Sequence, residues 1–270
     1  MNAIAPELLR QVPGCESGAA PLAVQTLPGG RGVNGVWRVR TRAGDFVLRL
    51  RHEPVDRPGS ASRFELGAHR LAAAAGLAPT VVNAAPDGRW LIMDFVDSPP
   101  WSEAKLLSDA GIDALGGLLR RLHALPCAGL PRMDVPGIAR GYFAAIGDSR
   151  NPADKVEVAL AALERDSQAL AGISGRAVLN HGDLMAANVL DRAAQGPTLV
   201  DWEYAQCADP TWDVACLLAY YPGLESRLDR LLAACGLSSA EDRRILSLQR
   251  CLFEGLDRLW QQAEAGNWIS

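Results

Sequence analysis

The sequence predicts an α+β protein of two lobes, and three observations support this fold class. Within residues 1–97, strand-forming segments alternate with glycine turns around a single helical segment. Residues 98–270 show mainly helical periodicity, interrupted by two short apolar pieces. The run Asp97-Ser98-Pro99-Pro100 is typical of a boundary between such units. We therefore predict a small antiparallel-sheet N-lobe with one helix, residues 1–97, and a larger, mainly helical C-lobe, residues 98–270.

Turn signals define the elements of the N-lobe. Strand formers cluster in residues 21–30, 33–44 and 45–52, and Ala-Gly-Asp at 43–45 predicts a hairpin between the last two. Residues 60–79 have helical periodicity, with Ser60 or Ser62 as the N-cap and Gly76 as the C-terminal stop. A second hairpin is predicted over residues 81–96, with its turn at Pro86-Asp87-Gly88.

The C-lobe is predicted to be helical around a small β insertion. Helical patterns cover residues 109–126, 137–149 and 153–173, and most of the chain from Trp212 onward. Between them lie the apolar pieces 178–183 and 188–202. The turn residues from Arg192 to Pro197 predict that the second piece folds as a hairpin.

Bulk properties restrict the class of function. The net charge of −4 gives no general attraction to nucleic acid or to an anionic membrane. Residues 1–97 carry 11 Arg and 9 acids, so the remaining 16 basic and 22 acidic residues make the C-lobe acidic. This excess favours a cationic small substrate, and its alternative explanation is ordinary solvated surface. No window approaches the ~20 uncharged apolar residues that a membrane span requires.

The cysteines and the N-terminus predict a cytoplasmic protein. The first residues lack the basic start and apolar core of a signal peptide. The cysteines contain no CxxC pair, which argues against zinc and redox motifs, and we expect them to be reduced thiols. They are Cys15, Cys127, Cys207, Cys216, Cys235 and Cys251.

The chemistry is concentrated in residues 179–205. Asp183 follows His-Gly, Asn188 comes five residues later, and Asp201 ends an apolar run. A carboxylate can orient an attacking hydroxyl and accept its proton. An amide and a second carboxylate can supply oxygen ligands to Mg²⁺, whose remaining ligands are phosphates and water. A lone Asp183 would be read as a loop residue bonded to nearby backbone, but the spacing to Asn188 and Asp201 favours phosphoryl transfer.

This segment resembles the aminoglycoside phosphotransferase and choline kinase family, which shares the two-lobed architecture of protein kinases. The resemblance lies in HGDLMAANVL and LVDWEYA, and DWEYA looks most like the choline, ethanolamine and thiamine kinase branches. It implies that Asp183 is the catalytic base and that Asn188 and Asp201 bind magnesium. His181 would support the catalytic loop, and Asp213 of DPTWDVA would hydrogen-bond that loop and hold its shape.

The N-lobe carries further parts of the resemblance. LPGGRGVNGVWRV is similar to the family's nucleotide-covering turn, with Gly30 and Asn34 as candidate ATP contacts. A kinase then needs a cation on the next strand, and no lysine occurs before Lys105. Arg49 occupies the matching place and offers a permanently charged fork to phosphate oxygens. Choline- and thiamine-kinase-like members also show arginine there, and Glu65 on the following helix is its expected partner.

The segment LIMDFVDSPP resembles the hinge that binds adenine through backbone groups. The expected contacts are Met93, Asp94, Phe95 and Val96. Val47 and Leu190 could sandwich the base, although apolar residues at these positions could equally be ordinary core.

Aromatic faces and acids in the C-lobe are the candidates for an acceptor site, because they hold quaternary ammonium groups. Each aromatic residue could instead be core packing. The acids are Glu203 and Asp209, and the aromatic residues are Trp202, Tyr204, Trp212, Tyr220, Tyr221, Trp260 and Trp268.

The resemblance implies an ATP- and Mg²⁺-dependent kinase that phosphorylates a small-molecule hydroxyl. An amino alcohol such as choline or ethanolamine, or thiamine, is the first choice of acceptor, and an aminoglycoside or sugar is the second. A nucleotide-binding pseudokinase acting as a regulatory module is the alternative from another class, against which Asp183, Asn188 and Asp201 argue. The segment from Asp201 to Asp213 is too short for the activation loop of a protein kinase.

Overall fold

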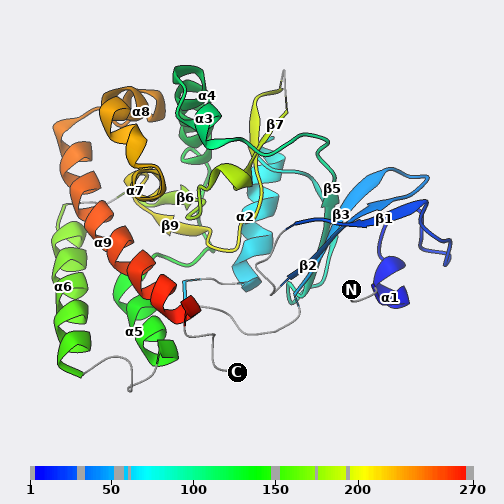
Figure 1. Ribbon diagram of the computed structural model, residues 1–270, viewed down its shortest axis with the longest axis horizontal. Coiled ribbons are helices and arrows are strands. Elements are labelled where there is room, and N and C mark those ends of the chain that lie inside the picture. Colours follow the sequence, from blue (N-terminus) through cyan, green and yellow to red (C-terminus); the bar gives the residue numbers. More distant parts are fainter. Residues whose placement is uncertain are drawn as a thin grey trace.

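The computed structural model describes residues 4–28, 34–51, 58–59, 62–146, 153–173, 176–192 and 195–265. Its N-lobe is a five-stranded antiparallel sheet in the order β1-β2-β3-β5-β4 (Figure 1). The strands are β1 (Ala23–Thr26), β2 (Asn34–Arg40), β3 (Asp45–Arg51), β4 (Val81–Ala84) and β5 (Trp90–Asp94). Both predicted hairpins are present, since β2 pairs with β3 and β4 with β5.

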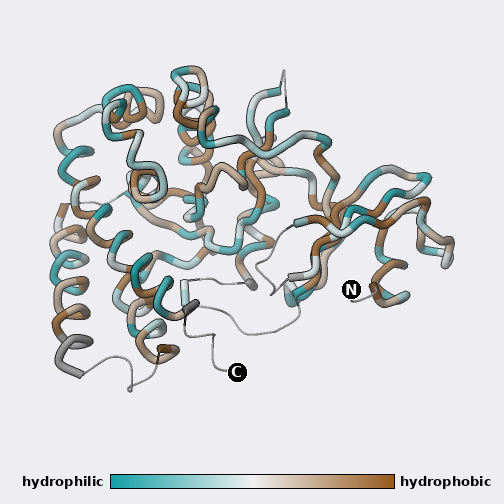
Figure 2. Tube along the Cα trace, in the orientation of Figure 1, coloured by the Kyte–Doolittle hydropathy of each residue, from teal (hydrophilic) through white to brown (hydrophobic). Residues whose placement is uncertain are grey.

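The two faces of this sheet have different roles because successive side chains of a strand point to opposite sides. Trp37 and Val39 of β2 and Leu48 of β3 pack with Leu8 of α1 (Pro6–Leu9) in a small core. The sequence analysis did not predict α1. The alternate residues, among them Arg49, face the C-lobe. Figure 2 shows apolar residues interleaved with hydrophilic ones along strands and helices alike.

Helix α2 (Ser62–Ala74) lies between the sheet and the C-lobe (Figure 1). Ala68 and Ala72 are fully buried, and their small side chains let the helix approach the core of the C-lobe closely. Beyond the helix, Gly76 has a φ of 71°, a conformation that glycine adopts without strain, as its predicted role as a stop requires. Ser60 and Ser62 were proposed as N-caps, and the part of the chain that the structure describes does not include their side chains.

The C-lobe is mainly helical, as predicted, and its helices enclose one continuous apolar core. Helix α4 packs on α8, and α9 runs diagonally across α5, α6 and α7 (Figure 1). No helix in the described part of the chain combines the length and apolar character needed to cross a bilayer. The helices are α3 (Glu103–Leu106), α4 (Asp109–Leu122), α5 (Val135–Ile146), α6 (Ala153–Ala171), α7 (Thr211–Tyr220), α8 (Leu228–Cys235) and α9 (Ala240–Ala265).

The β insertion of the C-lobe consists of two short strand pairs. The predicted hairpin forms from β7 (Val189–Asp191) and β8 (Pro197–Leu199). The apolar piece before it, β6 (Val178–Asn180), pairs instead with β9 (Gln206–Ala208), which the sequence analysis did not identify as a strand. The candidate catalytic residues lie in the connections between these strands.

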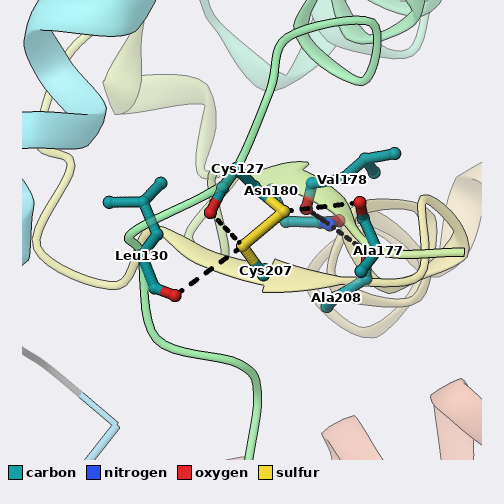
Figure 3. Close-up of a disulfide and its surroundings, with 7 residues drawn as sticks. All are labelled: Cys127, Leu130, Ala177, Val178, Asn180, Cys207 and Ala208. Carbon is teal, nitrogen blue, oxygen red and sulfur yellow. Dashed lines mark hydrogen bonds between the residues drawn. A yellow bond between two sulfur atoms is a disulfide. The ribbon is translucent and has the colours of Figure 1, made fainter.

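One disulfide contradicts the expectation that all cysteines are reduced. Cys127 and Cys207 are joined, and their Cα atoms are 5.7 Å apart (Figure 3). The bond ties the connection between α4 and α5 to β9, beside the strand that leads into the catalytic segment. Sequence spacing gave no signal because these residues are 80 positions apart and meet only in the folded protein. Of the others, Cys15, Cys216 and Cys235 are buried free thiols and Cys251 is exposed.

Candidate active site

A cavity of about 620 Å³ lies between the inner face of the N-lobe sheet and the C-lobe. Strands β2, β3 and β5 and helix α2 form its N-lobe wall. The segments after β6 and β8 and helices α5, α7 and α9 form its C-lobe wall. Asp183, Asn188 and Asp201, the residues predicted for catalysis and metal binding, all line this cavity. The fold therefore brings these three residues together with Arg49, the cation predicted to bind phosphate.

Asp213 fixes the shape of the catalytic segment from beneath. Its carboxylate is fully buried and accepts hydrogen bonds from the backbone amides of His181, at 3.2 Å, and Gly182, at 2.9 Å. His123 Nε2 at the end of α4 lies 3.0 Å from the same carboxylate. A buried carboxylate needs such donors, and here they are the peptides that precede Asp183. Asp213 thus lies where the sequence analysis expected it, whereas His123 was missed because it is 90 residues away.

His181 and Gly182 shape the turn immediately before Asp183. The Nδ1 atom of His181 accepts the amide of Asp183 at 3.3 Å, so Nε2 carries the hydrogen and donates to the Val200 carbonyl at 3.0 Å. This imidazole links the turn to the segment that carries Asp201. Gly182 has a φ of 80°, and a Cβ there would lie 2.5 Å from the Tyr204 carbonyl oxygen. Only glycine fits this position, which explains the His-Gly-Asp sequence.

Both carboxylate oxygens of Asp183 have hydrogen-bond donors. Asn188 Nδ2 donates to Oδ2 at 3.0 Å and to the backbone carbonyl of Asp183 at 2.9 Å. The Tyr220 hydroxyl, at the end of α7, donates to Oδ1 at 3.3 Å. Burial, reinforced by nearby Cys216 and Asp183, raises the pKa of Tyr220, so its hydroxyl stays protonated and able to donate. The carboxylate is therefore held in one orientation in the cavity.

Asp201 faces Asp183 from the segment after β8. Its φ of 66° makes it the only non-glycine residue with a positive φ in the part of the chain that the structure describes. Aspartate tolerates this conformation better than most residues. Burial raises the pKa of Asp201, nearby Glu65 and Asp183 add to the shift, and Arg49 opposes it. The side chain is still 35% exposed, because it borders the cavity.

The oxygen atoms of Asn188 and Asp201 fit a hard dication such as Mg²⁺, whose remaining ligands would be phosphate oxygens and water. Both Nδ2 contacts of Asn188 go to Asp183, which leaves the amide oxygen Oδ1 for a cation. Burial raises the pKa of Asp201, and the same ion would favour its charged form and offset the repulsion from Glu65 and Asp183 that adds to the shift. No group of three or more His, Cys, Asp or Glu side chains that could hold a metal by itself occurs among the described residues. Mg²⁺ needs no such cage, because one or two carboxylates and the phosphates suffice.

Arg49 pairs with Glu65 of α2, the partner expected from the sequence. Its Nη1 also lies 3.4 Å from Asp201 Oδ1. A second arginine, Arg51, contacts the other oxygen of Glu65 at 2.7 Å and lies 3.8 Å from Glu203. The sequence analysis missed Arg51. The signal was available in FVLRLRH, because positions two apart on a strand share one face.

Burial and ion pairing act in opposite directions on the charged groups around Arg49. Burial opposes the charged form of Arg49, but the Glu65 carboxylate outweighs burial and holds the pKa of Arg49 above its ordinary value. Burial likewise opposes the charge of Glu65, and the two arginines outweigh it and lower the pKa of Glu65. Glu203 behaves differently: burial, reinforced by Asp201, raises its pKa to about 7.

The predicted hinge residues differ in the groups that they can offer to a base. The amides of Asp94 and Phe95 donate to the carbonyls of Thr80 and Asp45, each at 3.0 Å. The N–H groups of Asp94 and Phe95 are therefore used within the sheet and are not offered to a base. Met93 lines the large cavity, whereas Asp94, Phe95 and Val96 border a smaller neighbouring one.

The apolar surface for a base differs from the predicted pair Val47 and Leu190. Neither residue lines the cavity, since Val47 is buried and Leu190 forms a β-bridge with Pro100. On the N-lobe side the cavity is lined by the apolar side chains of Val36, Leu91 and Met93, and Val200 of the C-lobe also lines it. Gly30 lies outside the described residues, and Asn34 is described only by its backbone, as the first residue of β2.

The acceptor candidates divide into cavity residues and core residues. Glu203, Tyr204 and Trp260 line the cavity. Trp202 does not: it is fully buried, its ring lies 4.8 Å from that of His181, and its Nε1 donates to the Leu199 carbonyl. The expectation for Trp202 is thus corrected, because its indole packs beside His181 in the core of the C-lobe and not in the cavity.

Asp209 likewise serves the scaffold. Its buried carboxylate accepts the amide of Thr211 at 3.0 Å and its hydroxyl at 2.8 Å, at the start of α7. It lies outside the cavity lining, so the negative charge that it was expected to supply near a cation is used elsewhere.

Helix α9 supplies three cavity residues that were not predicted from the sequence, Phe253, Leu256 and Asp257, beside the predicted Trp260. Phe253, Leu256, Asp257 and Trp260 line the cavity at intervals of three and four residues, so they form one face of the helix. Tyr142 of α5 and Trp212 and Tyr220 of α7 complete an aromatic wall around them. Trp212 and Tyr220 both pack edge-on against Phe253, at centroid distances of 5.2 and 5.6 Å. Only the packing of these helices could show that they share one cavity.

Comparison with known proteins agrees with this architecture. A family model described as "Phosphotransferase enzyme family" matches residues 24–247. No curated protein sequence matches the chain.

Among solved structures, a choline/ethanolamine kinase family protein from Mesorhizobium loti has a TM-score of 0.75 at 23% identity, over 98% of this chain and 87% of that one. Choline kinase LicA from Streptococcus pneumoniae has a TM-score of 0.76 at 16% identity, over 95% and 90%. APH(2")-IIIa, solved with GDP and kanamycin, has a TM-score of 0.61 at 20% identity, over 97% and 98%. These likenesses establish the two-lobed, protein-kinase-like fold.

Proposed function

The chain belongs to the phosphotransferase enzyme family, and from that membership we propose that it transfers the γ-phosphoryl group of ATP to a hydroxyl of a small molecule. One observation carries this proposal. Asp183 lies in the same cavity as the Arg49–Glu65 pair and as the aromatic side chains of α5, α7 and α9. A carboxylate placed between a phosphate-binding cation and an acceptor pocket is what phosphorylation of a hydroxyl requires.

Each residue has a role that its contacts support. Asp183, fixed by Asn188 and Tyr220, would orient the acceptor hydroxyl and take its proton as the hydroxyl oxygen bonds to phosphorus. Arg49 would bind phosphate oxygens of the nucleotide. Asn188 Oδ1 and the Asp201 carboxylate would hold Mg²⁺, which when bound neutralises part of the phosphate charge.

The acceptor that this cavity suits best is an amino alcohol such as choline or ethanolamine, or thiamine. Aromatic faces bind alkylated ammonium groups, and Tyr142, Trp212, Phe253 and Trp260 offer them. Among the described lining residues outside the catalytic and arginine groups, Asp257 is the only carboxylate, which suits a singly charged acceptor. A polycationic aminoglycoside calls for several acids. The structures named as choline kinases also have higher TM-scores than APH(2")-IIIa.

The test is a coupled ADP-release screen with Mg²⁺ and ATP over choline, ethanolamine, thiamine, aminoglycosides and amino sugars. We expect turnover with a member of the first three. Asp183→Ala should abolish turnover while ATP binding, measured by calorimetry, persists; retained turnover would remove Asp183 from its proposed role.

Two other outcomes are informative. Turnover of aminoglycosides or amino sugars alone would refute the acceptor class and leave the phosphotransferase assignment intact. ATP binding without turnover of any compound would instead favour a regulatory, pseudokinase-like module.

A further inference from the structure

The contacts of Arg51 exceed what a purely structural ion pair with Glu65 would require. It shares the inner face of β3 with Arg49, and the two guanidinium groups bind opposite oxygens of Glu65. One arginine already neutralises the single charge of Glu65. The Arg51 side chain is only 10% exposed, it lines the cavity, and its buried Nε has no hydrogen-bond partner among the described residues. An unpaired buried donor is costly unless a ligand satisfies it.

The strand register places Arg51 beyond Arg49 along the path of a nucleotide. Phe46, at the start of β3, pairs with Asp94 at the hinge, where the base is expected. Arg49 is three positions further along β3 and Arg51 is five. Arg51 is therefore about 7 Å further from the hinge than Arg49. A phosphate chain that runs from the hinge passes Arg49 first and reaches Arg51 with its terminal group.

The charge balance of the cavity also calls for a second cation. Four carboxylates, those of Asp183, Asp201, Glu203 and Asp257, border it in addition to Glu65. Arg49 and Arg51 are the only lysine or arginine side chains among its described lining residues. A nucleoside triphosphate remains anionic even with one dication bound, so these carboxylates repel it. Cationic side chains are needed to offset that repulsion.

We propose that Arg51 is a second phosphate-binding arginine, which holds the terminal phosphate of a nucleoside triphosphate while Arg49 holds the preceding ones. This inference rests on the proposed function and extends it by assigning two cations to successive parts of one phosphate chain. A small rotation toward the cavity would give Nε an acceptor while Nη2 keeps Glu65. Glu203, at 3.8 Å, faces Arg51 as Asp201 faces Arg49.

The experiment measures binding of ATP, ADP and AMP by calorimetry in the presence of Mg²⁺. Arg51→Met should weaken ATP binding about 10- to 100-fold and leave AMP binding within about twofold. Arg49→Met should weaken both ATP and ADP. If Arg51 contacts phosphate directly, the two losses in ATP affinity multiply in the double variant. If it only orients Glu65 and Arg49, the double variant matches Arg49→Met, and the proposal is overturned.

Controls separate folding from binding. Arg40→Met removes an exposed ion pair of β2 with Asp45 and should leave all three affinities unchanged. Arg51→Lys keeps the charge and should retain part of the ATP affinity, so it provides the same comparison if Arg51→Met does not fold. Equal losses of ATP and AMP affinity in either variant would overturn the proposal. An unmodified protein that binds no nucleotide would overturn both this inference and the proposed function, whereas ATP binding that ignores Arg51 overturns this inference alone.

Discussion

Asp213→Asn tests whether the buried carboxylate under the catalytic segment holds it in place. The carboxylate accepts the amides of His181 and Gly182 and faces His123 Nε2 at 3.0 Å. An asparagine of the same shape can accept at one atom only, and its amino group would face the His181 amide, donor against donor. The orphaned amide costs about 1–3 kcal/mol, and loss of charge weakens the remaining bonds. We expect unfolding to become easier by about 2–5 kcal/mol.

The assay is urea unfolding alongside turnover with the acceptor found in the screen. We expect a lower urea midpoint and a fall in kcat, because the peptides before Asp183 lose their anchor. Asp229→Asn is the matched control: this acid pairs with Arg243 on the surface, its side chain is 87% exposed, and neither quantity should change. An Asp213→Asn variant with wild-type stability and kcat would show that this carboxylate does not anchor the peptides before Asp183.

Three further predictions test other parts of the structure. Burial lowers the pKa of His69 to about 4, whereas histidine in the unfolded chain has a pKa of about 6.5, so the unfolded chain binds the proton first as the pH falls. Urea unfolding should therefore show about 2 kcal/mol less stability at pH 5 than at pH 7 from this group. The His69→Gln variant should lack that part of the loss. The Cys127–Cys207 bond closes a loop of 80 residues, and its reduction should lower the free energy of unfolding by about 2–4 kcal/mol in the same assay. The Cys251→Ser variant should show the same difference between oxidised and reduced protein. An unchanged urea midpoint in dithiothreitol would contradict a stabilising role of the bond. Tyr220→Phe removes a donor to Asp183 and should lower kcat about 10-fold with unchanged ATP affinity; a change in ATP affinity alone would place Tyr220 on the nucleotide side.

Local sequence was sufficient to predict most of the elements and to identify the candidate catalytic residues. The two hairpins of the N-lobe and the end of α2 followed from turn residues, because backbone conformation at such positions depends on near neighbours. Asp183, Asn188 and Asp201 could be identified because they lie in one continuous segment. Their roles in catalysis remain predictions, which the screen and the variants test.

Tertiary structure decided which side chains meet. His123 reaches Asp213 across 90 residues, Cys127 reaches Cys207 across 80, and α9 completes the aromatic wall of the cavity. The orientation of Trp202 toward the core and of Glu203 toward the cavity depended on which face of their segment was covered.

The sequence alone thus predicted most strands and helices of this phosphotransferase and its candidate reactive groups, since these depend on residues close together in the chain, although α1 and β9 were not predicted. The cavity, the partners of Asp183 and the pairing of Arg51 were decided by the fold, because contacts between distant segments depend on how whole helices and sheets pack.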